Sequence, residues 1–182
     1  MRNRILPRLK LEKKILSISV LLLVACFFSV AAHAENPAPQ KTWSQDKRYA
    51  DNGDETITDT KTELMWMKMD AFQQKGHLLN WKEAIAFVEK LNTENFADHN
   101  DWRAPTRKEL VTLYEADKIN SSLDMNVHID PLFAKNGLAA QWSSELNGQF
   151  NAFGVVFNTG DIFSANIKAK SKKSVRAVRN IK

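Results

Sequence analysis

The 182-residue sequence contains a single cysteine, Cys26, and this residue lies in an N-terminal segment that we expect to be removed. The rest of the chain then has no thiol for a disulfide, a thiolate nucleophile or a thiolate metal site. Disulfides are permitted in an exported protein, but none can form here. We therefore expect the domain to be held together by core packing alone.

Sequence motifs of enzymes are also scarce. No Gly-x-Ser-x-Gly motif is present, and a serine nucleophile would need a base and an orienting group. His77, His99 and His128 are far apart, and none belongs to a pair with the spacing of metal ligands. We predict no metal site, no cofactor and no enzymatic activity. The alternative is a cell-envelope hydrolase built from carboxylates.

The apparent excess of positive charge does not belong to the folded part of the chain. The whole sequence carries 26 basic and 21 acidic residues. Residues 1–34 hold six of the basic residues and one acid, which leaves 20 of each sign in residues 35–182. A chain without net charge has no general attraction to polyanions, so such affinity must come from a local patch. We expect no binding to nucleic acid.

Residues 1–34 are typical of an export signal. A basic segment is followed by an apolar run over residues 15–30, and Ala32-His33-Ala34 matches the small-x-small pattern of signal peptidase sites. Cleavage is predicted between Ala34 and Glu35. The apolar run is shorter than the roughly 20 residues that span a bilayer as a helix, so an uncleaved anchor is the less favoured alternative. The predicted location is the periplasm, the outer surface or the medium.

Cys26 offers a second interpretation of the leader. Leu-Val-Ala-Cys, ending at Cys26, also fits the lipobox at which bacterial lipoproteins are cut and acylated. The apolar run continues through residues 27–32, whereas a lipoprotein usually becomes polar soon after its cysteine. We favour the cut after Ala34, and membrane attachment is expected only through the leader or a lipid on Cys26.

The exported chain is predicted to form one α+β domain over residues 48–182, after a flexible linker over residues 35–47. A run of strands, then two helices, then a meander of strands favours an antiparallel sheet over a parallel α/β arrangement. The expected strands are residues 56–58, 64–67, 140–144, 152–158, 162–166 and 174–180.

The two main helices have clear start signals. Asn80 can cap the first, whose apolar residues recur at the spacing of three and four that places them on one face. Thr106 and Glu109 form a capping box at the start of the second. The predicted buried face of the first helix comprises Trp81, Ala84, Ile85, Val88 and Leu91.

Several short motifs along the chain resemble, in order, a known exported bacterial domain, the C-terminal domain of the Legionella collagen-like protein. Asp-Trp-Arg-Ala-Pro-Thr at 101–106 matches the family's Trp-Arg-Leu-Pro-Thr, with Ala104 in place of the leucine. The other motifs lie at residues 51–59, 64–66, 81–84, 109–110, 142–144 and 175–179.

The resemblance implies a C-type-lectin-like architecture, binding to sulfated or other acidic polysaccharides as in an adhesin, and a homo-oligomer. A related architecture occurs in formylglycine-generating enzymes, but their chemistry requires reactive cysteines, which residues 35–182 lack. No collagen-like repeat precedes the domain in this sequence, so assembly driven by collagen and the adhesin role do not follow directly from the resemblance.

Two polar clusters are candidate sites with structural alternatives. Asp101, Trp102 and Arg103 could bind a carboxylate or sulfate through the guanidinium. We favour the alternative in which Arg103 pairs with an internal acid and Trp102 fills the core. The acidic segment 51–59 could bind calcium, but its spacing differs from that of an EF-hand, and turn formation explains its Asp and Asn residues better.

The C-terminal segment has the strongest charge asymmetry. Residues 162–182 carry seven basic residues and no acid, whereas residues 35–161 carry 13 basic and 20 acidic residues. These cations could bind an acidic polysaccharide or pair with acids inside the domain. The candidate polyanion-binding residues are Lys168, Lys170, Lys172, Lys173, Arg176 and Arg179.

We predict a non-enzymatic, exported binding module for an acidic polysaccharide or a cell-surface protein. A structural or assembly subunit is a further alternative to the hydrolase.

Overall fold

The computed structural model describes residues 41–123 and 125–181. The predicted signal peptide, its cleavage site and Cys26 lie outside the described residues, as do residues 35–40 of the predicted linker. Within the part of the chain that is described, no helix is long and apolar enough to cross a membrane.

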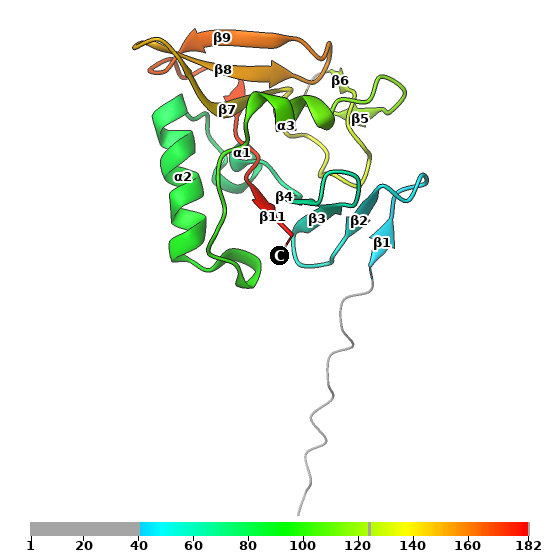
Figure 1. Ribbon diagram of the computed structural model, residues 1–182. Coiled ribbons are helices and arrows are strands. Elements are labelled where there is room, and N and C mark those ends of the chain that lie inside the picture. The colour runs from blue at the N-terminus through cyan, green and yellow to red at the C-terminus, as the bar shows by residue number, and fades with distance from the viewer. Residues whose placement is uncertain (1–40, 124, 182) are drawn as a thin grey trace, which may run out of the picture. The chain divides into compact units, whose positions relative to one another are not determined.

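The first sheet has five antiparallel strands in the order β1-β2-β3-β4-β11 (Figure 1). Its strands are β1 (Thr42–Trp43), β2 (Tyr49–Asp51), β3 (Thr56–Asp59), β4 (Leu64–Met67) and β11 (Val178–Asn180). The predicted strands at residues 56–58 and 64–67 are confirmed as β3 and β4, which pair directly as a hairpin with Ile57 opposite Trp66.

The sheet also begins earlier than predicted. β1 pairs with β2, and Ser44 is buried, with its hydroxyl accepting a hydrogen bond from the backbone N–H of Tyr49. Residues 42–47, which the sequence analysis placed in the flexible linker, are therefore folded. The predicted boundary between linker and domain was therefore too late in the sequence. The prolines at positions 37 and 39, which indicated a linker, both precede β1.

The second sheet has four strands in the order β10-β7-β8-β9, and all its pairs are antiparallel except the short β10-β7 pair. Its strands are β7 (Ala140–Asn147), β8 (Asn151–Val156), β9 (Ile162–Asn166) and β10 (Lys173–Ser174). A separate two-stranded ribbon consists of β5 (Asn120–Ser121) and β6 (Asn126–Val127).

Four helical segments lie between and beside the sheets, namely α1 (Ala71–Lys75), α2 (Trp81–Thr93), η1 (Phe96–Asp98) and α3 (Arg107–Thr112). The predicted start signals are confirmed. Asn80 and Glu83 form a capping box on α2, and Thr106 and Glu109 form one on α3. Asp70 and Gln73 cap the short α1, which was not predicted.

The predicted strand over residues 174–180 is wrong as a single element. Ser174 belongs to β10 of the second sheet, whereas Val178 begins β11 of the first sheet. The intervening Val175, Arg176 and Ala177 are all buried as the chain passes from one sheet to the other. Figure 1 shows this passage in red near the middle of the domain.

Two apolar clusters form the core. One includes Trp102, Trp142 and the buried side of α2, and the other includes Tyr49, Trp66 and Phe133. Mixed helices and antiparallel sheets confirm the α+β class, and the C-type-lectin-like architecture stays a prediction.

Candidate ligand pocket and the C-terminal cations

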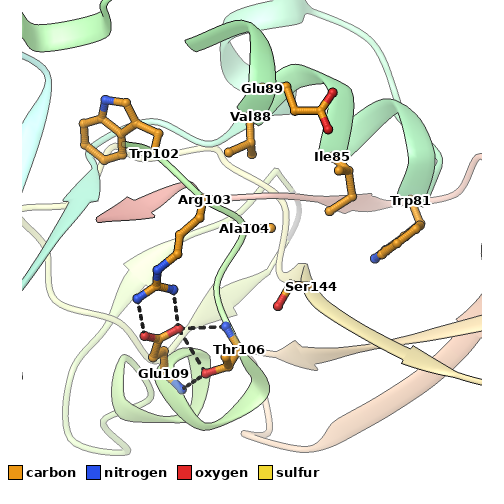
Figure 2. Close-up of a pocket in the computed structure, with 10 residues that line it drawn as sticks. All are labelled: Trp81, Ile85, Val88, Glu89, Trp102, Arg103, Ala104, Thr106, Glu109 and Ser144. Carbon is orange, nitrogen blue, oxygen red and sulfur yellow. Dashed lines mark hydrogen bonds and ion pairs between the residues drawn. The ribbon is translucent and has the colours of Figure 1, made fainter. Parts of the chain in front are cut away.

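A pocket of about 530 Å³ lies between α2, the segment 102–106 and the start of α3 (Figure 2). Several of its lining residues belong to the motifs that were recognised in the sequence. The pocket is lined by Trp81, Ile85, Val88, Glu89, Trp102, Arg103, Ala104, Thr106, Glu109 and Ser144.

Trp81 and Ile85 make one wall of this pocket. Both were predicted to lie on the buried face of α2, but both are only partly buried, whereas Phe87 is buried instead. The indole Nε1–H of Trp81 donates a hydrogen bond of 2.8 Å to the carbonyl oxygen of Ser143. Since an indole has only this one donor, the bond fixes the ring at the edge of the pocket.

Arg103 and Glu109 form the polar floor. The guanidinium donates through Nη1 and Nη2 to the two carboxylate oxygens of Glu109, at 2.8 and 2.6 Å. Glu109 also accepts hydrogen bonds from the backbone N–H and the hydroxyl of Thr106. The predicted internal pairing of Arg103 is confirmed, with Glu109 rather than Asp101 as the partner.

The electrostatics of this pair favour its charged form. Burial acts to raise the pKa of the Glu109 carboxyl, but the hydrogen bonds from Arg103 and Thr106 outweigh it and hold the pKa below its ordinary value. The same pairing raises the pKa of the Arg103 guanidinium. The floor of the pocket is thus an ion pair whose charges neutralise each other and whose carboxylate oxygens both accept hydrogen bonds.

Two other polar residues of the pocket are available to a ligand. Glu89 and Ser144 are exposed, and their side chains make no hydrogen bond or ion pair with any described residue. α2 therefore supplies both the apolar wall and the carboxylate of Glu89, and Ser144 supplies a hydroxyl from another segment (Figure 2).

The other members of the predicted 101–103 site have structural roles. Trp102 is buried, and its indole N–H donates to the carbonyl oxygen of Phe96 at 3.0 Å. Asp101 pairs with Arg179, whose Nε lies 2.6 Å from the carboxylate. The structure therefore brings Trp102 and Arg103 to the pocket and turns Asp101 away toward β11.

Two of the candidate polyanion-binding residues are inside the domain, which corrects their assignment to the surface patch. Arg176 is 2% exposed and donates to the carbonyl oxygens of Met67 and Lys68. Arg179 is 5% exposed and paired with Asp101. The sequence could not separate these arginines from the neighbouring lysines, because all lie in one basic segment and only the crossing between the sheets buries them.

The remaining candidate cations lie at the surface or near it. Lys173 is half-buried, and its ammonium lies 5.5 Å from the ring centres of both Trp142 and Phe163. Lys168, Lys170 and Lys172 are exposed on the connection between β9 and β10, which we call the lysine loop (residues 168–172).

The lysine loop lies beside the Trp81 end of the pocket. The backbone N–H of Trp81 donates to the carbonyl oxygen of Ile167, which directly precedes the loop, at 3.2 Å. Lys170 pairs with Glu83 of α2 at 2.7 Å. This pairing lowers the pKa of the Glu83 carboxyl. The loop is thus attached to the first turn of α2.

The acidic turn is held by internal contacts. Asp51 pairs with Lys68 at 2.6 Å, Asp54 accepts from the hydroxyl of Thr56, and the buried Asp59 pairs with Arg48. Within residues 41–123 and 125–181, no group of three or more His, Cys, Asp or Glu side chains could hold a metal ion.

The chain matches a known family of protein domains. The model of the Lcl C-terminal domain matches residues 55–179, more than half of the chain. No curated protein matches the sequence. The match includes every residue that lines the pocket, together with the lysine loop and both buried arginines.

Proposed function

The chain belongs to the family of Lcl C-terminal domains, and we propose that it is an exported, non-enzymatic binding module that holds a sugar ring of a polysaccharide in the pocket beside Trp81. The observation that carries the proposal is the partly buried indole at the edge of a cavity that also contains free polar groups. Binding sites of this kind combine an apolar lining with a few polar groups that fix orientation.

A pyranose ring matches this arrangement. One face of such a ring presents C–H groups, which pack on an aromatic surface, while its hydroxyls project around the rim and need donors and acceptors. Trp81 and Ile85 supply the apolar wall, and Glu89 and Ser144 supply the polar groups. Because the indole is already fixed by its bond to Ser143, little side-chain entropy is lost on binding.

The state of the carboxylates favours binding over hydrolysis. A retaining or inverting glycosidase needs one protonated carboxyl group and a second free carboxylate on the two sides of the bond that is cleaved. Glu109 meets neither requirement, because Arg103 and Thr106 occupy its oxygens and keep its pKa low. Glu89 is then the one free carboxylate among the residues that line the pocket.

The lysine loop supports an acidic rather than a neutral polysaccharide. Lys170 lies at the first turn of α2, which also holds Trp81, so an acidic group beyond the stacked ring would reach this lysine. This contact is smaller than the six-cation patch expected from the sequence, since Arg176 and Arg179 are inside the domain.

The proposal is tested by measuring binding of the purified protein to a glycan array of neutral and uronic-acid-containing polysaccharides. We expect Trp81→Ala to abolish detectable binding. Trp43→Ala is the matched control, since Trp43 is 43% exposed and lies outside the pocket.

Thermal melting of each variant separates a lost ligand site from a lost fold. Retained binding by folded Trp81→Ala would overturn the proposed site. Release of reducing ends from a bound glycan by wild-type protein would favour the hydrolase.

A further inference from the structure

A small cavity lies between the β5–β6 ribbon, β7 and the crossing between the sheets at residues 175–177. Its volume is about 10 Å³. A cavity of roughly 10–15 Å³ holds one water molecule. The lining includes the buried side chains of Gln141 and Arg176, and it shares no residue with the pocket beside Trp81. The cavity is therefore a separate feature of the domain.

Gln141 presents an unpaired acceptor at this cavity. The side chain is 1% exposed, and its Nε2 donates to the carboxylate of Asp70 at 2.9 Å and to the carbonyl oxygen of Leu138 at 2.7 Å. Because both partners are acceptors, they fix which end of the amide carries the nitrogen. The other end, Oε1, is buried and accepts no hydrogen bond from any described residue.

Arg176 presents an unpaired donor at the same cavity. The side chain is 2% exposed, and its Nη1 donates to the carbonyl oxygens of Met67 and Lys68. Its Nε is buried and has no hydrogen-bond partner within residues 41–123 and 125–181. A buried donor without a partner is costly, so the two unpaired atoms indicate a ligand that bonds to both.

The chemistry of the two atoms selects the ligand. A metal cation is disfavoured by the adjacent guanidinium of Arg176. A halide ion would accept from Nε but would face the oxygen of Gln141, which is also an acceptor, and it is larger than water. A water molecule accepts from the first atom and donates to the second, and a bridge of this kind is nearly as favourable as a direct hydrogen bond.

We infer that the cavity binds one structural water molecule, which accepts a hydrogen bond from Nε of Arg176 and donates one to Oε1 of Gln141. The inference does not depend on the proposed function. The water completes a buried chain of hydrogen bonds from the carboxylate of Asp70 through Gln141 to Arg176.

This chain explains how the domain accommodates a buried cation. Burial lowers the pKa of Arg176 to about 10, and the charge of Asp70 acts against that lowering. Asp70 itself is 0% exposed and caps α1. The water therefore connects the cap of α1 and the second sheet with the segment that crosses to the first sheet, and it links the two buried charges through polar groups alone.

The first test is a high-resolution crystal structure of the purified protein. We expect one peak of electron density at hydrogen-bonding distance, about 2.7–3.2 Å, from both Arg176 Nε and Gln141 Oε1. Crystals grown in bromide distinguish water from a halide, and we expect no anomalous signal at the cavity. An empty cavity, or a bromide signal in it, would overturn the inference.

The second test compares two side chains of the same shape at Ala134, which lines the cavity. Ala134→Thr and Ala134→Val should both displace the water. The threonine hydroxyl can bond to the atoms that the water served, whereas valine leaves them unpaired. We expect the valine variant to melt at a lower temperature than the threonine variant, by about 3 °C or more. The same two substitutions at the exposed Ala169 are the matched control and should melt alike.

A dry cavity would give the opposite result. Filling an empty apolar space with a methyl group stabilises a protein, so an Ala134→Val variant that melts above both wild type and Ala134→Thr would contradict a bound water. Equal melting temperatures of the two variants would also overturn the inference, because the polar atoms would then need no partner. If neither variant folds, the crystal structure of the wild-type protein decides.

Discussion

Replacement of Arg176 by alanine should destabilise the domain strongly. The guanidinium donates to the carbonyl oxygens of Met67 and Lys68 and lies 4.9 Å from the ring centre of Phe133. Two charge-assisted hydrogen bonds and the ring contact together contribute about 6 kcal/mol. Burial of the charge opposes them, because it lowers the pKa of Arg176 to about 10. That lowering of the pKa corresponds to a burial cost of roughly 3 kcal/mol. Subtracting it from the contribution of the contacts, we expect Arg176→Ala to lower the free energy of unfolding by about 3 kcal/mol.

The loss is measured by urea denaturation followed by tryptophan fluorescence. Arg176→Ala should lower the free energy of unfolding with an unchanged m-value. Lys168→Ala is the matched control, because its side chain is exposed, and it should change stability by less than about 0.5 kcal/mol.

Heparin chromatography of the same proteins separates the structural role from a binding role. A variant with Lys168, Lys170 and Lys172 replaced by alanine should elute at lower salt than wild type, whereas folded Arg176→Ala should elute with wild type. A stability loss below about 1 kcal/mol for Arg176→Ala, together with reduced retention, would refute the internal role of this arginine.

Two further predictions concern the pocket floor and the second sheet. Glu109→Gln should lower the free energy of unfolding by about 1 kcal/mol at pH 7. The effect is small because Arg103 is 39% exposed and solvent screens the ion pair. The pKa of Glu109 in the folded protein is held below its ordinary value of about 4.3. The difference in unfolding free energy between wild type and Glu109→Gln should therefore persist above pH about 4.3 and vanish as the pH falls through the folded pKa. Denaturation at several pH values checks this. Gly154→Ala should destabilise the domain by about 1–3 kcal/mol, because a Cβ atom there would collide with the carbonyl oxygen of Gln141 and the ring of Phe163. A melting temperature equal to that of wild type would contradict this.

The parts of the fold that could be predicted from the sequence are those that depend on nearby residues. The caps at Asn80 and Thr106 each involve a partner three residues away, and both helices begin where these signals place them. The turn before β9 likewise depends on a short segment, in which Gly160 adopts a left-handed conformation with φ of 80°. Local chemistry decides these features, so no knowledge of the tertiary structure is needed.

The features that were missed depend on contacts between distant segments. Arg176 is buried because the chain crosses between two sheets at that point, and the partners of its side chain lie more than 100 residues earlier. The pocket was missed for a related reason. The helical periodicity places Trp81 and Ile85 on the apolar face of α2, but it cannot show that the segment 102–106 leaves a cavity beside them.

The charge distribution of the chain also limits how the protein can bind an acidic polymer. All of the acidic residues precede residue 162, and the basic tail follows it, so folding brings opposite charges together. Arg179 pairs with Asp101, and Lys170 pairs with Glu83. Cations that are already engaged in this way contribute little to counterion release when a polyanion binds. Under the proposed function, affinity for an acidic polysaccharide is expected to come mainly from the shape and polar groups of the pocket, with a weaker dependence on salt than a six-cation patch would give.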